Sequence, residues 1–220
     1  MKLLFPLLAA GFLLTACSNL PTVQPAGDFA ATLQPLCRDP FPKGKWQFVH
    51  SIEAVMPGGR SAFVTGVVVL SSVDRTFRCV ILTIEGLAVF DAEWDRRLTV
   101  NRAIAPFDSK PFAEGLAEDI RLLFLHPRGS PVESGLLQDG DSLCRYRDSN
   151  GGIVDVVSRG GGGWGIQRYT RDLHLVRTVN MVPGGSAGQD EIPQKIELTA
   201  RGPQAYKLIM NLVEAVRIEE

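Results

Sequence analysis

Closely spaced strand patterns constrain this chain more than any other feature of its sequence. From Trp46 to Met56, apolar side chains recur at alternate positions, which is typical of a half-buried β-strand. Pro57-Gly58-Gly59-Arg60 then supplies a turn. Short polar connections separate the apolar segments that follow, which cover residues 63–70, 76–84, 87–94 and 98–105. Five consecutive strands joined by short turns predict an antiparallel meander.

Residues 63–70 and 76–84 differ from the first strand because they are apolar at both alternating sets of positions. A strand with two apolar faces is typical of a sheet that is covered on both sides. We therefore expect these two strands to be buried on both faces.

The apolar period changes between residues 108 and 125, where a helix is predicted. Asp108 or Ser109 can cap its start, Pro111 suits the first turn, and His126-Pro127 ends it. Its apolar residues recur every three or four positions, on one helical face: Phe112, Leu116, Ile120, Leu123 and Phe124.

The second half of the chain returns to strand patterns. Residues 205–218 fit either a strand or a helix, and their place after a series of strands favours a strand. A short helix is predicted over residues 28–37. The fold class is therefore α+β and mostly antiparallel β, with about ten strands. The remaining predicted strands cover residues 142–147, 153–158, 164–170, 173–181 and 194–200.

The N-terminus carries a targeting pattern. A basic start, Met1-Lys2, precedes an apolar run over residues 3–14 that is shorter than the about 20 residues a membrane span needs. Leu14-Thr15-Ala16-Cys17 follows, and this stretch resembles a bacterial lipobox. The resemblance implies cleavage before Cys17, a diacylglyceryl thioether on its sulfur, and acylation of the new amine, for example with palmitate.

This pattern divides the chain into three parts. Residues 1–16 are expected to be a signal peptide, residues 17–27 the lipidated cysteine and a tether, and residues 28–220 a single domain. Ser18 after the cysteine, by resemblance to enterobacterial lipoproteins, favours the outer membrane. An ordinary signal peptide followed by a chance cysteine is the alternative.

Three cysteines remain in an oxidising compartment, where a disulfide is permitted. Cys37, Cys79 and Cys144 allow three different single bridges, each leaving one thiol over. Because Cys79 lies in an apolar strand, where a free thiol behaves as a small hydrophobic residue, the pair Cys37–Cys144 is favoured.

Composition and motifs argue against several kinds of function. The formal net charge of −1 argues against a nucleic-acid binder, and the three histidines have no metal-ligand spacing, so neither a metal nor a cofactor is expected. Ser186 lies in a G-x-S-x-G sequence that lacks the strand and helix of a nucleophile elbow. His50, on an apolar strand face, is expected to be a core residue. The glycines at 160–163 lack a phosphate-loop ending, although the arginines beside them could meet lipid phosphates or lie at solvated strand edges: Arg159, Arg168 and Arg171.

The order of these elements resembles the Lol superfamily of lipoprotein carriers and receptors. The tract from Leu116-Ala117-Glu118-Asp119-Ile120 to Pro127, and the hairpin Ile84-Glu85-Gly86-Leu87, look similar to a branch of lipoproteins associated with aryl-polyene biosynthesis genes. The resemblance implies a strongly curved, incompletely closed barrel with a helical lid over a cavity for acyl chains. It also implies a membrane-facing hairpin tip, at Leu87. The residues expected to line the cavity are Trp46, Phe48, Phe63, Val67, Ile81, Phe90, Trp94, Leu116, Ile120 and Phe124.

These observations favour a non-enzymatic protein that binds acyl chains or lipidated cargo. It is expected to be a monomer, anchored in the bacterial outer membrane through Cys17 and facing the periplasm. The alternative is a structural or assembly lipoprotein with a closed core that acts through a protein partner. A serine hydrolase using Ser186 is the remote alternative.

Overall fold

The computed structural model describes residues 20–24, 37, 39–160, 162–184, 192–203 and 205–219. Two antiparallel meanders flank helix α1 (Lys110–Phe124) in the chain. The first meander contains β1 (Lys45–Val55), β2 (Ser61–Ser71), β3 (Thr76–Leu82), β4 (Ala88–Asp95) and β5 (Arg97–Ala103). The second contains β6 (Glu133–Leu136), β7 (Ser142–Arg147), β8 (Ile153–Ser158), β9 (Trp164–Tyr169), β10 (Leu175–Pro183), β11 (Pro193–Ala200) and β12 (Tyr206–Ile218).

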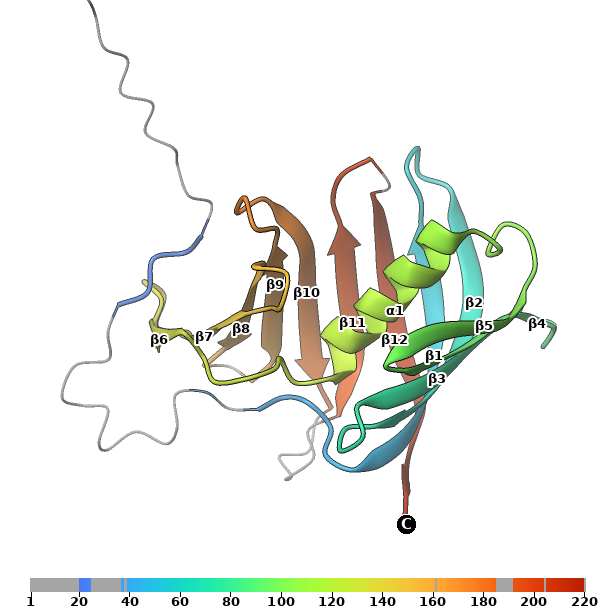
Figure 1. The fold of residues 1–220 in the computed structure, drawn as a ribbon, viewed down its shortest axis with the longest axis horizontal. Coiled ribbons are helices and arrows are strands. Elements are labelled where there is room, and N and C mark those ends of the chain that lie inside the picture. The colour runs from blue at the N-terminus through green and yellow to red at the C-terminus, as the bar shows by residue number, and fades with distance from the viewer. Residues whose placement is uncertain are drawn as a thin grey trace, which may run out of the picture.

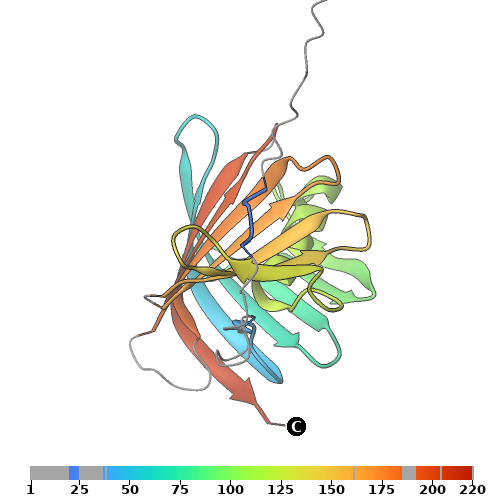
Figure 2. The ribbon, with the colours of Figure 1, turned by 90° about the vertical axis from the view of Figure 1, so that its left-hand side faces the viewer.

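The described strands form one sheet of twelve, in the order β5-β4-β3-β2-β1-β12-β11-β10-β9-β8-β7-β6. The two meanders join where β12 pairs with β1. The sheet is strongly curved and α1 lies in its concave side (Figure 1). Seen end-on, the strands curl into an incompletely closed barrel (Figure 2). This confirms the predicted fold class.

The sequence signals around helix α1 act as predicted. The hydroxyl of Ser109 accepts a hydrogen bond from the Phe112 amide at 3.3 Å, which satisfies one of the unpaired donors at the helix start. The helix ends at Phe124, and the Leu125 amide still donates to the Arg121 carbonyl at 3.0 Å. Its inner face buries a row of small and large apolar side chains, including Ala113, Ala117, Ile120, Leu123 and Phe124.

The ambiguous C-terminal segment is a strand, as favoured. Strand β12 runs from Tyr206 to Ile218 and pairs on one side with β1 and on the other with β11. It therefore unites the two meanders. Strand β6 was not predicted from the sequence, and the helix predicted over residues 28–37 lies outside the described residues except for Cys37.

Residues 20–24, which fall within the predicted tether, lie against the sheet, and the division of the chain at residues 17 and 28 stays a prediction. Gln24 and Leu136 of β6 exchange backbone hydrogen bonds of 2.8 and 3.0 Å. Gly135 allows this approach, because a Cβ there would overlap the Gln24 carbonyl oxygen. Residues 20–24 therefore cover the β6 edge of the sheet.

The expectation that β2 and β3 are buried on both faces was wrong. On β2 the inner residues Val68 and Leu70 are buried, whereas the outer residues Val67 and Val69 are only half-buried. Burial on both faces occurs instead in β7 and β8, where Leu143 through Tyr146 and Ile153 through Val157 are all buried.

Candidate functional site: the concave face beneath the helix

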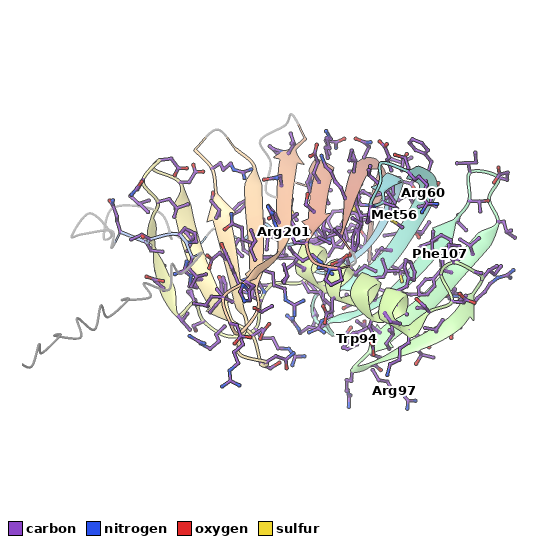
Figure 3. All side chains as sticks on the ribbon, turned by 90° about the horizontal axis from the view of Figure 1, so that it is seen from above. Met56, Arg60, Trp94, Arg97, Phe107 and Arg201 are labelled. Carbon is purple, nitrogen blue, oxygen red and sulfur yellow. A yellow bond between two sulfur atoms is a disulfide. The ribbon has the colours of Figure 1, made fainter. Side chains whose placement is uncertain are left out.

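Aromatic side chains fill the space between helix α1 and the sheet. Phe48 of β1 stacks on Phe124 of the helix with ring centroids 5.2 Å apart, and on its strand neighbour Trp46 at 5.7 Å. Phe90 of β4, with no exposed surface, meets Phe112 of the helix edge-to-face at 5.3 Å. Figure 3 shows this crowding of side chains between α1 and the strands. The interior is a continuous apolar layer.

Eight of the ten residues expected to line a cavity share this interior. Trp94 is half-buried, stacks on Phe77 at 6.4 Å between ring centroids, and is labelled in Figure 3. Leu116 is also half-buried and packs against the core. All eight belong to one packed hydrophobic core, so their role as the lining of a ligand cavity stays a prediction. They are Trp46, Phe48, Ile81, Phe90, Trp94, Leu116, Ile120 and Phe124.

Phe63 and Val67 were assigned to the wrong face. Directly paired residues share a face, and Phe48 pairs with Val68, so Val67 points to the outside of the sheet. Phe63 pairs with Glu53 on that outer face and is 60% exposed. The glycine at position 66, inside a strand, was the available sign of the inner face. A Cβ there would lie 2.7 Å from the Ile52 side chain, so Gly66 belongs to the crowded inner face.

A buried carboxylate connects helix α1 to two strands of the second meander. Asp119 is only 2% exposed and accepts a hydrogen bond from Arg177 Nε of β10 at 2.9 Å and one from the Tyr206 hydroxyl of β12. The Arg177 guanidinium also lies 5.5 Å from the centroid of the Tyr206 ring. We call these three residues, Asp119, Arg177 and Tyr206, the helix latch.

Burial governs the charges of the helix latch. Desolvation raises the pKa of Asp119, while Arg177 and the Tyr206 hydroxyl oppose that rise by stabilising the carboxylate. Desolvation and the neighbouring Asp119 together raise the pKa of Tyr206, so its hydroxyl remains a donor. This cluster was not predicted from the sequence. The available signal was that Asp119 lies three residues after Leu116 and four before Leu123, on the apolar helical face.

Two further polar contacts hold the outer side of the helix. Arg168 Nη1 of β9 lies 2.9 Å from Glu118 Oε2. The Arg121 guanidinium carbon lies 4.9 Å from the centroid of the Trp94 ring of β4, a cation–π contact. The helix is therefore attached by polar groups to both meanders.

An arginine-rich pocket opens at the C-terminal end of the helix. Its volume is about 140 Å³, and it lies between the helix end, the β2–β3 turn and the β7–β8 turn. Leu122, Leu125, Tyr146 and Val154 contribute apolar and aromatic surface to its wall. Its charged lining consists of Arg75, Arg121, Arg128, Arg147, Arg168, Glu118 and Asp148.

Two buried groups on the inner face, His50 and Cys79, are uncharged at neutral pH. Burial lowers the pKa of His50 to about 4, and its Nδ1 has no hydrogen-bond partner. Burial raises the pKa of the Cys79 thiol to about 12, so this free cysteine is protonated and chemically inert. Among the described residues, no His, Cys, Asp and Glu side chains cluster in a way that could hold a metal ion.

Cys37 and Cys144 form a disulfide, as favoured by the sequence. The bridge joins positions 107 residues apart and ties the segment before β1 to the inner face of β7. Phe41, four residues after Cys37, is buried and packs edge-on against His126 at 5.7 Å between ring centroids. This segment therefore belongs to the folded domain.

The outer face of β7 and β8 carries a buried ion pair. Arg145 donates through Nε and Nη2 to the two oxygens of Asp155, both at 2.8 Å. The same guanidinium reaches Glu133 of β6 at 2.5 Å and the Pro21 carbonyl at 3.1 Å. The pair therefore holds residues 20–24 against the sheet.

The other predicted features lie in turns. Leu87 is 54% exposed and Ile84 is 76% exposed, on either side of Gly86 at φ +87° in the β3–β4 hairpin. In the turn after β8, the Gly162 amide donates to the Arg159 carbonyl at 3.0 Å, and the Arg159 guanidinium donates to Asn180 Oδ1 at 2.8 Å. Arg171 is exposed, and Ser186 lies outside the described residues. In the part of the chain that the structure describes, no helix has the length and apolarity to span a membrane.

Comparison with known proteins identifies the fold. No family model matches the chain, and no curated protein matches its sequence. A solved LolA-superfamily protein of Nitrosomonas europaea is similar in structure, with a TM-score of 0.56 and 11% sequence identity over 82% of this chain and 89% of that one. An outer-membrane lipoprotein-sorting protein domain of Vibrio parahaemolyticus gives a TM-score of 0.46 at 10% identity, over 80% of this chain and 88% of that one. The similarity to the Nitrosomonas europaea protein shows that the curved sheet and its inner helix share the fold of that LolA-superfamily protein.

Proposed function

We propose that this protein binds acyl chains, free or attached to a lipidated cargo, between helix α1 and the concave face of the sheet. It acts as a lipid-anchored protein of the outer membrane that faces the periplasm, and it catalyses no reaction. The observation that carries the proposal is the combination of a LolA-superfamily fold with an apolar interior that a single helix covers.

The chemistry of the interior supports this proposal. An acyl chain leaving a membrane needs apolar contacts in return, because each buried methylene is worth about 0.8 kcal/mol. Phe48, Phe90 and Phe124 would give up their present aromatic contacts for contacts with the acyl chain. Binding therefore requires α1 to move away from the sheet.

The attachment of the helix supports such a movement. The helix latch, the Glu118–Arg168 pair and the Arg121–Trp94 contact are all polar and surround the apolar layer. Water can satisfy these polar groups when the helix lifts, which lowers the cost of opening. In this mechanism α1 is a lid and the helix latch sets how often it opens.

The location rests on Cys17 and its lipobox resemblance. Residue 24 already pairs with β6, so the sheet edge at β6 would lie within a few residues of the membrane anchor. The exposed tip of the β3–β4 hairpin, with Leu87, is a second candidate for membrane or cargo contact. If the chain belongs to the branch associated with aryl-polyene genes, its cargo is a polyene lipid.

A closed-core assembly protein is the second candidate. It is favoured by the complete burial of several inner residues, such as Phe48 at 1% exposure and Phe90 at 0%. Such a protein takes up no lipid and acts through a partner on its surface.

The helix latch provides the test between these functions. Asp119→Asn in the mature chain, with Cys17→Ala to remove the anchor, should weaken the latch by about 1.5–3 kcal/mol and raise the open population about tenfold or more. Binding of the neutral probe N-phenylnaphthylamine, followed by fluorescence, should become correspondingly tighter. Native mass spectrometry of protein purified without detergent should detect a co-purified lipid.

Glu114→Gln is the matched control, because Glu114 lies exposed on the same helix and, among the residues that the structure describes, pairs only with Lys110, at 3.6 Å. It should leave probe binding unchanged. The melting temperature of each variant separates an open helix from an unfolded sheet. A protein that carries no lipid and takes up no probe, even as Asp119→Asn with an intact fold, supports the closed-core function instead.

A further inference from the structure

We propose that the pocket at the C-terminal end of helix α1 binds a phosphate-class oxyanion between the guanidinium groups of Arg75, Arg121 and Arg128. The oxyanion site stands independently of acyl binding. Its use for a lipid headgroup rests on the function proposed above.

The three arginines come from separate parts of the chain and converge on one pocket. Arg75 lies in the β2–β3 turn, Arg121 in the last turn of α1, and Arg128 in the segment that follows the helix. None of the three has a carboxylate within ion-pair distance among the described residues. Three cations thus share one pocket, and none of them forms a direct ion pair among the described residues.

The two carboxylates of the pocket are engaged elsewhere. Glu118 lies 2.9 Å from Arg168, and Asp148 lies 3.7 Å from the same guanidinium. Asp148 also accepts the backbone amides of Asn150 and Gly152, each at 2.8 Å, within the β7–β8 turn. Both carboxylates of the pocket therefore form their ion pairs with Arg168 and not with Arg75, Arg121 or Arg128.

Two of the three guanidinium groups are positioned in advance. Arg75 Nη1 donates to the His126 carbonyl at 2.9 Å, and Arg121 lies over the Trp94 ring. Burial and mutual repulsion lower the pKa of Arg75, with Arg128 and Arg121 as the repelling charges. Burial first and then Arg128 lower the pKa of Arg121, and Glu118 and Asp148 oppose this shift only in part. An oxyanion would relieve this repulsion and accept bidentate hydrogen bonds from the planar groups.

The size and wall of the pocket define the ligand class. A volume of about 140 Å³ is below the ~300–1,000 Å³ of sites for whole drug-sized ligands, so a headgroup fits and an entire lipid does not. Leu122, Leu125 and Val154 in the same wall lie beside the apolar interior. The pocket therefore suits free phosphate, or the phosphate of an amphiphile whose chains enter under α1.

The test is calorimetric titration of the mature Cys17→Ala chain with inorganic phosphate at low ionic strength. Arg121→Gln combined with Arg128→Gln should weaken phosphate binding about tenfold or more, since charged hydrogen bonds are lost. Arg128→Gln alone guards against misfolding, because Arg128 is exposed and forms no hydrogen bond or ion pair within the described part of the chain. Arg60→Gln is the matched control: Arg60 is exposed in the β1–β2 turn, labelled in Figure 3, and does not line the pocket.

A second titration distinguishes the two sources of phosphate. Dihexanoyl phosphatidic acid binding at least about tenfold tighter than glycerol 3-phosphate, with the same arginine dependence, supports a lipid headgroup. Equal binding of the two supports a free-phosphate site, and uptake of the neutral probe then reports separately on acyl binding. Absence of phosphate binding, or an equal loss in Arg60→Gln, overturns the proposal.

Discussion

Strands β2 and β3 in one half of the sheet differ from β7 and β8 in the other in how their outer faces are covered. Strand β2 carries valines on both faces, yet its outer residues Val67 and Val69 are half-exposed. Strands β7 and β8 carry Arg145 and Asp155 on their outer faces, yet both faces are buried. Burial therefore follows what packs on the outer face. The Arg145–Asp155 ion pair and the docked residues 20–24 cover the outer face of β7 and β8, whereas the outer face of β2 is open to solvent.

The largest effect is expected from breaking the buried pair. Asp155→Ala should lower the free energy of unfolding by about 3–5 kcal/mol, because it leaves the Arg145 charge buried without its main partner. Urea denaturation measures this loss. Asp91→Ala in the first half is the matched control, since its partner Arg78 is 59% exposed, and its loss should be much smaller. Equal losses in both variants would contradict the expected difference between the buried pair of β7 and β8 and the exposed pair of β3 and β4.

The disulfide also involves a strand that is buried on both faces, because Cys144 lies in β7. Cys144→Ser should cost about 2–4 kcal/mol, because the bridge restricts the unfolded chain over a long loop. Reductant should lower the free energy of unfolding of the wild-type protein, measured by urea denaturation, by a similar amount. It should leave that of Cys144→Ser unchanged. Cys79→Ala retains the bridge and should still respond to reductant, and a variant without that response would argue against the pairing.

The burial of His50 on the inner face of β1 can be tested through the pH dependence of stability. Its pKa is about 4 in the folded protein and about 6.5 when unfolded, so the unfolded chain binds the proton more readily. The stability that depends on neutral His50 is present above pH 6.5 and is lost as the pH falls towards 4, by about 3 kcal/mol. Thermal unfolding from pH 7 to 4 should show this slope, reduced in His50→Leu. Parallel slopes for both proteins would place the pH dependence elsewhere.

The smallest effects are expected from two glycines. A Cβ at Gly115 of α1 meets nothing within 4 Å, so Gly115→Ala should stabilise the helix by roughly 0.5–1 kcal/mol.

A Cβ at Gly135 would overlap the Gln24 backbone, so Gly135→Ala should release residues 20–24 from β6 and destabilise the region around β7 and β8. Thermal melting and limited proteolysis near residue 24 measure the two outcomes. A Gly135→Ala protein as protease-resistant as the wild type would show that the docked segment contributes little.

Much of the fold could be predicted because strand and helix signals are local. Alternation identified β1, the apolar face of 108–125 identified α1, and position resolved the ambiguous 206–218. The eight inner residues of the first meander and helix followed from the same periodicities. Phe63 and Val67 were misplaced because β2 is apolar on both faces and its register depends on its pairing with β1.

The helix latch and the arginine pocket could not be predicted in the same way. Asp119, Arg177 and Tyr206 lie up to 87 residues apart and meet only when α1 enters the curved sheet. Arg75 and Arg128 line one pocket because the β2–β3 turn lies next to the segment after the helix, where Arg75 Nη1 donates to the His126 carbonyl. Polar residues in separate elements carry no common period, so no local pattern relates them.

Spacing along the chain and residue type were enough to predict the antiparallel meanders, the central helix and most of the apolar inner face, and they favoured Cys37–Cys144 among three possible pairings. Only the tertiary structure decided which face of β2 is buried, that Arg145 and Asp155 are interior, and that residues 20–24 cover an edge. The physical reason is that burial and pairing depend on the surroundings. The sheet brings those surroundings together from distant segments when it curves around α1.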